Sequence, residues 1–264
     1  MQQSPTHYRR ITRFIVAAFA AACALVSASS SADTLNVPPG NPCLLNNGNP
    51  CRGNNGNLGQ QGNAAQERVH IDRRPQSISI PMPAVVDRSV FITQVGDSNQ
   101  ANVVQSAPNA YAKIDQNGDD NDADVAQRGT GKAYVEASQT GDSNFARVEQ
   151  SGSGANVAYV TQNGNGNWLW SSQDAIGAIN NGARLTQTGD NNDMMLYQGG
   201  GDNLAVLTQQ GDGNGMSATQ LGGGNRLTWT QTGDNLSDLK ITQYGGSTQT
   251  GQLLITQTNI GPAH

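Results

Sequence analysis

A repeat of 22 to 25 residues constrains the fold of this chain more than any other feature. From about Ser89 onward, two Gln residues, a Gly and an Asn recur in the pattern Q-x-G-x-x-N-x5-Q. Six copies keep this spacing, a seventh has its Asn and second Gln displaced by one position, and a half-copy ends the series. A fixed period of this length is typical of stacked repeat proteins. The recurring amides are Gln94, Asn99, Gln105, Gln116, Asn121, Gln127, Gln139, Asn144, Gln150, Gln162, Asn167, Gln173, Gln187, Asn192, Gln198, Gln209, Asn214, Gln220, Gln231, Gln243 and Gln257.

Each copy contains two segments in which apolar and polar residues alternate. In the first copy, Val90 and Ile92 precede the leading Gln, and Ala101 and Val103 precede the second Gln. A period of two predicts strands that bury one face. Both Gln residues and the Asn share the buried phase with the apolar residues. Each copy is therefore predicted to form a strand, a turn and a second strand around one core.

The residues between the two predicted strands favour a tight turn. Gly is followed by Asp in six of the seven copies, as in Gly96-Asp97, and both residue types suit turns. Insertions fall only in the return turn, for example within 174–182 and 244–252. The Asp residues would form a column in which neighbours repel by about 1 kcal/mol in water. Two interpretations follow: the column restrains assembly, or Asp is present only as a good turn former.

One strand-turn-strand unit cannot bury its inner face alone, because an isolated pair of strands is marginally stable in water. Stacking solves this problem, since equivalent strands can pair in parallel about 4.8 Å apart. Inward Gln and Asn side chains would then bond to their counterparts, whereas an unpaired buried amide costs about 1–3 kcal/mol. The sequence predicts an all-β fold, a parallel β-solenoid of stacked strand-turn-strand repeats with amyloid-type cross-β stacking.

The last half-copy, from Leu253 to Gln257, is as strand-like as the internal segments, and only a few residues follow it. A monomeric solenoid normally covers its terminal coils. An uncovered strand edge templates a second chain. We therefore expect exposed solenoid ends through which the protein assembles with itself into a fibre.

The first 32 residues have the pattern of a removable secretory signal peptide. Arg9, Arg10 and Arg13 precede an Ala-rich apolar run over 15–26 and then a Ser-rich stretch. This run is shorter than the roughly 20 apolar residues of a transmembrane helix. Without these residues, 12 basic residues face 20 acidic ones, a formal charge of −8. Such an acidic chain is a poor binder of nucleic acid.

Residues 33–88 form a second region, which is rich in Gly, Asn and Pro. No hydrophobic period survives there, so a flexible segment is expected. The run Ser77-Ile78-Ser79-Ile80 alternates like a strand before prolines interrupt it. The repeat domain then spans 89–264, as seven repeats and a terminal half-repeat.

Cys43 and Cys51 are the only cysteines that follow the signal segment. In an oxidising compartment they could close a small disulfide loop. A metal site is the alternative, but His70 and His264 lie far away in the sequence. We favour the disulfide and expect neither a metal nor another cofactor.

The repeated pattern resembles the curlin repeat of curli fibre subunits, which is written around S-x5-Q-x-G-x-x-N-x-A-x3-Q. Residues 94–105, 116–127 and 139–150 match it from the first Gln onward, while later copies replace the Ala by Leu169, Met194 or Met216. The resemblance implies a non-enzymatic subunit of extracellular functional amyloid fibres that contribute to biofilm matrix and adhesion.

The resemblance also implies a route and partners. Curli subunits pass through the bacterial periplasm and leave unfolded through an outer-membrane curli-type secretion channel, and they assemble with a homologous subunit. The region 33–88 is similar in composition to their exporter-targeting leader, although it is longer and contains two cysteines. The family includes a major fibre-forming subunit and a minor, surface-located nucleator. We favour the fibre-forming subunit.

Three other functions fit parts of the pattern. Repeated Gly-Asp followed by Asn suggests a calcium-binding adhesin, but the tandem G-G-x-G-x-D spacing of calcium-binding β-rolls is absent. Thr residues before the leading Gln suggest an ice-binding solenoid, in which a second Thr column is expected; here only Thr228 and Thr230 pair. A polysaccharide-cleaving β-helix would need carboxylates or bases that converge on a cleft. No such constellation is evident.

Overall fold

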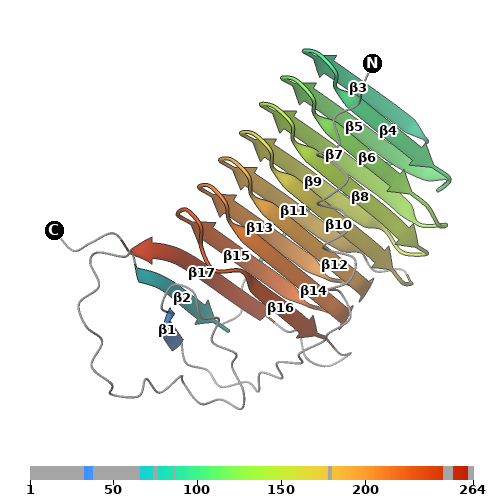
Figure 1. Cartoon of the computed structure of the whole chain (residues 1–264). Helices are drawn as coiled ribbons and strands as arrows, with labels where there is room; N and C mark the ends of the chain where they lie inside the picture. The colour runs from blue at the N-terminus through green and yellow to red at the C-terminus, as the bar shows by residue number, and fades with distance from the viewer. Residues whose placement is uncertain are drawn as a thin grey trace, which may run out of the picture.

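The computed structural model describes residues 33–37, 66–73, 77–85, 87–177, 180–245 and 252–260, and these residues form two sheets of strands without a helix (Figure 1). The long sheet contains β1 (Asp33–Val37), β2 (Gln66–Asp72), β3 (Ser89–Val95), β5 (Asn109–Asn117), β7 (Lys132–Thr140), β9 (Asn156–Asn163), β11 (Asn181–Thr188), β13 (Leu204–Gln210), β15 (Arg226–Thr232) and β17 (Gln252–Ile260). The short sheet contains β4 (Gln100–Gln105), β6 (Asp122–Gln127), β8 (Phe145–Gly152), β10 (Trp168–Ala175), β12 (Asp193–Gly201), β14 (Gly215–Gly223) and β16 (Leu239–Tyr244).

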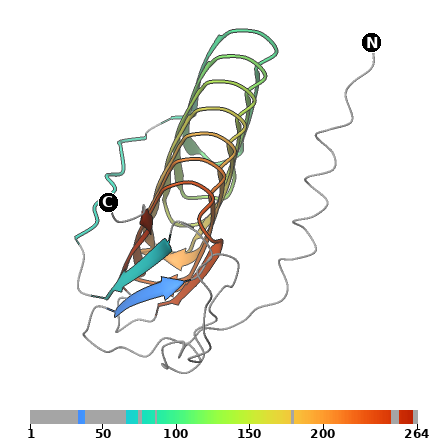
Figure 2. The same cartoon turned by 60° about the vertical axis from the view of Figure 1, so that its left-hand side comes forward.

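From β3 onward the chain alternates between the two sheets, and one strand from each sheet with its turn makes one coil. Within both sheets, strands of successive coils pair in parallel, as β11 does with β9 and β13. The predicted parallel β-solenoid is confirmed. Figure 2 shows the coils following one another along the stack.

The core lies between the two sheets and consists of the inward residues of every coil. Its buried apolar positions repeat along the stack, as in the column of Ile114, Ala137, Val160 and Leu185 on the long sheet. Because neighbouring strands are parallel and in register, each inward residue contacts its equivalent in the next coil. A thin core is thus continued by repetition and needs few apolar residues per coil.

Residues 33–88 differ from the expectation of a flexible segment. β2 pairs antiparallel with β17, and β1 pairs antiparallel with β2. Val69 is buried in the core and Ile71 packs against it. The expectation was wrong for 66–73, because the short run Glu67, Val69, Ile71 alternates like a strand inside a stretch of otherwise aperiodic sequence.

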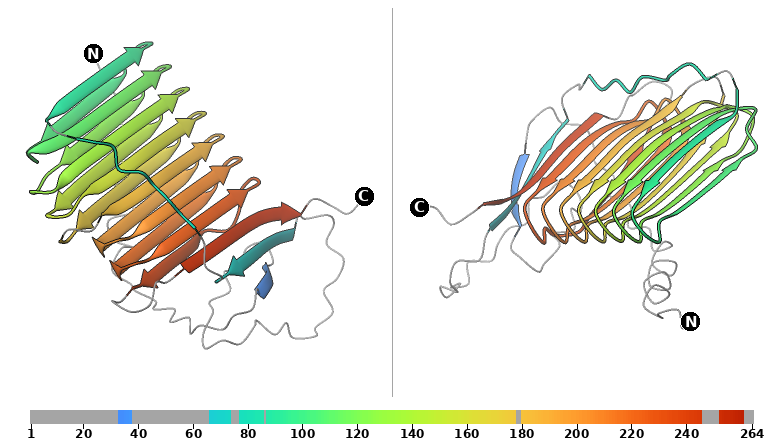
Figure 3. Two further views of the ribbon diagram at one scale, coloured as in Figure 1. Left: turned by 180° about the vertical axis from the view of Figure 1, so that it is seen from behind. Right: turned by 90° about the horizontal axis from the view of Figure 1, so that it is seen from above.

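A second part of this region, 77–85, lies along the outer face of the long sheet; we call it the strap (Figure 3). Its Ile80, Met82 and Val85 pack with Tyr134 and Val157. The strap therefore has a defined position, although it forms no strand. The predicted signal segment 1–32 and both Cys43 and Cys51 lie outside the described residues.

The two ends of the stack are different. At one end, β3 and β4 are the last strands of their sheets, and we call this the open end. At the other end, β2 covers the edge of β17, which corrects the prediction of an exposed last strand. We call this the closed end, although β16 remains the last strand of the short sheet. Within the described residues, no helix is long and apolar enough to cross a membrane.

Candidate assembly interface

The leading Gln residues form one continuous column of hydrogen bonds in the long sheet. Each Nε2 donates to the Oε1 of the equivalent Gln in the next coil, with donor to acceptor distances of 2.7 to 3.0 Å. We call this the long-sheet Gln ladder. Its members are Gln94, Gln116, Gln139, Gln162, Gln187, Gln209, Gln231 and Gln257. All except Gln94, at the open end, are buried.

The second Gln of each coil forms the short-sheet Gln ladder, with Nε2 to Oε1 distances of 2.8 to 3.1 Å. Its members are Gln105, Gln127, Gln150, Gln173, Gln198, Gln220 and Gln243. Gln243 stays in register with Gln220 despite its displacement in the sequence. Both ladders donate in the same direction, toward the closed end, so the stack has a chemical polarity.

The repeated Asn residues hold each turn between its two neighbours. Asn144, for example, donates from Nδ2 to Asn121 Oδ1 at 3.0 Å and to the Gly164 carbonyl at 2.7 Å. The buried amide thus replaces the water that its groups would otherwise need. The column contains Asn99, Asn121, Asn144, Asn167, Asn192 and Asn214. In the seventh coil Leu236, not the displaced Asn235, takes this position, and its backbone N–H donates to Asn214 Oδ1 at 3.0 Å.

A family model for the curlin associated repeat matches residues 179–211 and 189–222, which include four members of the two Gln ladders. Residues 179–222 therefore carry the curlin associated repeat. No curated protein and no solved structure gave a significant match to the chain. The curlin repeats of the matched segment share their strand register with the coils on either side.

A second Asn column, beside the return turns, was not predicted from the sequence. All four of its members are buried: Asn156 and Asn181 begin β9 and β11, and Asn203 and Asn225 lie one residue before β13 and β15. Asn203 Nδ2 donates to Asn181 Oδ1 at 3.2 Å, and Asn225 Nδ2 donates to Asn203 Oδ1 at 2.8 Å. The sequence does contain a regular spacing that could have predicted this column, because each of these Asn residues stands six positions before the leading Gln of its copy.

The Asp residues of the turns do form a column, and their side chains bond to the backbone. Asp212 Oδ1 accepts the backbone N–H of Asp190 at 2.7 Å, and Asp234 Oδ1 accepts that of Asp212 at 2.9 Å. Asn165 occupies the same position in the fourth copy of the repeat and accepts the Asp142 N–H at 2.8 Å. The column therefore needs a side-chain oxygen at each turn but not a charge.

An aromatic column on the outer face of the long sheet was also missed. The rings of Tyr111 and Tyr134 stack with centroids 4.8 Å apart, and Phe91 and Tyr159 extend the column. The strap covers part of these rings. Burial, followed by the hydrogen bond that its hydroxyl donates to Glu136, raises the pKa of Tyr134 above its ordinary value.

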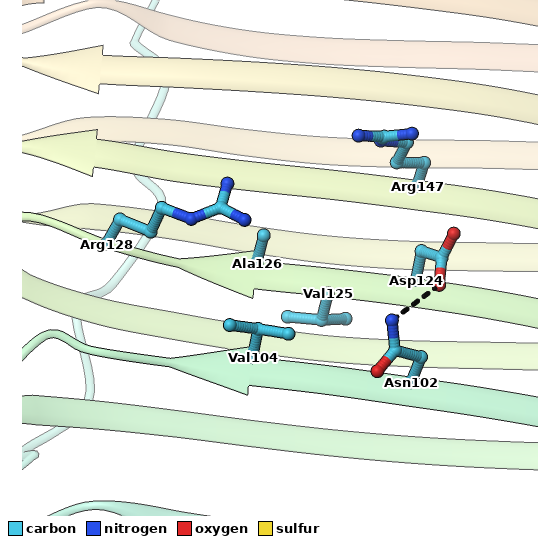
Figure 4. A pocket seen from close by; sticks show the side chains of 7 residues that line it. All are labelled: Asn102, Val104, Asp124, Val125, Ala126, Arg128 and Arg147. Carbon is cyan, nitrogen blue, oxygen red and sulfur yellow. Dashed lines mark hydrogen bonds between the residues drawn. The ribbon is translucent and has the colours of Figure 1, made fainter.

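The outer face of the short sheet has a shallow hollow over β4, β6 and β8 (Figure 4). Asp124 is the only carboxylate among its seven lining residues, and its Oδ1 accepts a hydrogen bond from Asn102 at 3.2 Å. Arg147, which also lines the hollow, is paired with Glu149 at 2.6 Å. This arrangement offers no pair of acid and base groups for hydrolysis. Among the described residues, no group of three or more potential metal ligands occurs.

The open end combines unused hydrogen-bonding groups with exposed apolar side chains. No donor within the described residues reaches Oε1 of Gln94 or of Gln105, because each is the first member of its ladder. Val90 and Ile92 are 43% and 44% exposed, although their equivalents in the next coil, Ala112 and Ile114, are fully buried. Such an end has the chemistry of an interface that lacks one coil.

Proposed function

We propose that this protein is a structural subunit of an extracellular, curli-type amyloid fibre that grows by stacking its coils end to end. The observation that carries the proposal is the open end, where the first acceptor of each Gln ladder meets no donor from the described residues. A second copy that adds its last coil there would supply the missing donors. This head-to-tail contact repeats without closing, so it builds a filament.

The match to the curlin associated repeat supports an extracellular fibre as the place where this protein acts. A role in biofilm matrix and adhesion, export through the periplasm and an outer-membrane curli-type channel, and assembly with a homologous subunit belong to this proposal. The proposed assembly residues are the members of the two Gln ladders and of the first Asn column. All of them lie on the inner face, where an added coil would continue the column.

The assembly proposal is tested with the chain that lacks residues 1–32. We expect amyloid-dye fluorescence to rise after a lag, preformed fragments to shorten the lag, and fibres to diffract at about 4.8 and 10 Å. A variant with Ile92→Lys at the open end should stop this growth, since stacking would bury an unpaired ammonium group. The matched control is Val104→Lys, because both residues are 44% exposed but Val104 lies on the outer face of β4.

Thermal unfolding of the two variants shows whether each monomer keeps its fold. A wild-type chain that stays monomeric and soluble under all conditions would contradict the proposed function. Equal growth of the Ile92→Lys and Val104→Lys variants would show that the open end is not the growing interface.

A second candidate function is the surface-located nucleator of such fibres. The observation that favours it is the covered edge of β17, because a stack with one open end can template growth in only one direction. Self-seeding growth of the purified chain without a helper indicates the fibre-forming subunit. Acceleration of a second curli-type subunit by small amounts of a chain that does not grow alone indicates the nucleator.

The remaining alternatives have weaker support from the geometry. Oδ1 oxygens in the Asp column already accept backbone N–H groups, which leaves a poor ligand set for calcium. Thr161, Thr186, Thr208, Thr230 and Thr256 form one continuous outward column. Thr228, by contrast, is flanked by Val206 and Leu254, so no second Thr column accompanies the first in an ice-binding face.

The effect of the Asp column on assembly can be measured directly. Changing Asp97 and Asp234, the first and last members of the column, to Asn should shorten the lag of fibre growth, because about 1 kcal/mol of repulsion between the two chains that meet is removed. The hydrogen bonds should survive, as Asn165 demonstrates in the wild-type chain. Acidification of the wild-type protein from neutral pH to about pH 4 should act in the same direction. An unchanged lag in both experiments would leave Asp as a turn former only.

A further inference from the structure

The edge of β17 is covered by a strand that comes from outside the repeats and pairs with it in the opposite direction to every strand of the coils. β2 aligns antiparallel along β17, from Leu254 opposite Asp72 to Ile260 opposite Gln66. All other neighbours from β3 to β17 in the long sheet pair in parallel. β2 thus occupies the edge on which the next coil of a growing stack would lie (Figure 1).

Glu67 ends the long-sheet Gln ladder. Its side chain is buried, its Oε1 accepts a hydrogen bond from Gln257 Nε2, and its Oε2 accepts the backbone N–H of Ser237 at 3.0 Å. A Gln at the end of a ladder would still offer donors to a further coil. An ionised carboxylate only accepts, so Glu67 receives the last donor of the ladder and passes none on.

The rest of β2 fits the core in the same way as a strand of a coil. Val69 is 3% exposed and Ile71 packs beside it, which continues the inward alternation that Glu67 begins. The strap continues the described chain from this end along the outer face toward β3 (Figure 3). One chain therefore supplies both the open end and the strand that covers its own opposite end.

We infer that β2 is an internal cap, which stands in for the β3 strand of a second copy and must leave β17 before that copy can dock. This inference rests on the proposed function, and it names the two surfaces that meet. The partner is a second copy of this chain, whose open end brings Gln94 Oε1 and Gln105 Oε1. They would accept from Gln257 and Gln243, the last Gln of each ladder. Release of the cap is then a step that limits how fast fibres start.

A disulfide between β2 and β17 tests the cap by fixing it in place. His70 and Thr256 lie opposite each other, on the outward phase of their strands. Opposite residues of antiparallel strands have Cα atoms about 4.5–5.5 Å apart, which a disulfide can bridge. The variant is His70→Cys/Thr256→Cys, with Cys43→Ser and Cys51→Ser to prevent other pairings. We expect no fibre growth while it is oxidised, and growth with the wild-type lag after reduction.

A second variant loosens the cap. Glu67→Ala removes both acceptors, so the lag should become several-fold shorter and the backbone amides of β17 should exchange with solvent faster in the monomer. Arg68→Ala is the control, because this neighbouring side chain is exposed and should leave both readouts unchanged.

The possible outcomes separate the two proposals. Growth of the oxidised variant at the rate of the reduced one, or a Glu67→Ala variant with wild-type lag and exchange, would overturn the internal cap and leave the fibre proposal standing. If neither the wild type nor the reduced variant grows, the proposed function itself fails. In that case, slow exchange of β17 in the wild type and fast exchange in Glu67→Ala would still support the cap.

Discussion

Replacing Gln209 by Glu is expected to lower the free energy of unfolding by about 3–5 kcal/mol, the cost of an uncompensated buried charge. Gln209 is fully buried, and its Nε2 donates to the carbonyls of Asp193 and Asn214 and to Gln231 Oε1, at 2.9 to 3.1 Å. The change exchanges this donor group for a carboxylate oxygen. Three acceptors would then face a negative charge without a proton between them.

Gln210 provides the matched control, because it is the same residue type at the next position and its side chain is exposed. Gln210→Glu should change the unfolding free energy by no more than about 0.5 kcal/mol. Both variants are compared by chemical denaturation of freshly prepared monomer, followed by circular dichroism. Equal stability of the two would mean that the Gln ladder contributes little to the fold.

The Gln209→Glu variant should also gain a pH dependence. Burial and the three acceptors favour the protonated carboxyl, so the pKa of the new Glu in the folded state is raised above that in the unfolded state. Its protonated form is therefore tolerated at low pH, and stability is lost as the pH rises. Recovery of stability on acidification, relative to Gln210→Glu, checks this sign.

Replacing Gly189 by Ala is expected to destabilise the solenoid by more than about 3 kcal/mol. The backbone at Gly189 has φ of +114°, and such strain alone costs a residue with a Cβ about 1–3 kcal/mol. A Cβ there would also lie 2.3 Å from the carbonyl oxygen of Gly211 in the next coil. Because that neighbour is backbone, relief requires the two coils to move apart, which breaks their hydrogen bonds.

Gly177→Ala separates the two causes. Gly177 also has positive φ, +81°, but a Cβ at this position meets no atom of the described chain within 4 Å. We expect a cost of only about 1–2 kcal/mol, from the backbone conformation. Denaturation midpoints of the two variants, measured side by side, test the difference. Similar midpoints would show that close approach of the turns is not a constraint on the stack.

The repeat was sufficient to predict the coils and the side chains that face their interior. Alternation around Val90 and Ile92 gave the inward face, and the common phase of Gln94 and Gln105 placed the amides on it. Even the displaced Gln243 returned to register, because Gln220 offers it a hydrogen bond that no neighbouring position would provide. The return-turn column of Asn203 and Asn225 was overlooked, although its spacing was equally regular.

The ends of the stack could not be predicted in this way. The edge of β17 offers backbone N–H and C=O groups that almost any extended segment can satisfy, so local sequence does not identify its partner. Gln257 and Glu67 are 190 residues apart, and no repeated spacing connects them. The same holds for the strap. Its contacts with Tyr134 and Val157 depend on where β2, which precedes the strap in the chain, lies on the stack.

The sequence by itself determined the strand-turn-strand coil, its inward amides and the parallel register. Each of these features is local and recurs at a fixed period, so every copy repeats the same physical requirement. Only the tertiary structure decided that one end is open and that the other carries an antiparallel strand with a buried carboxylate. That choice depends on which distant segment reaches the last edge and fills its core positions, and the periodicity of the repeats contains no information about it.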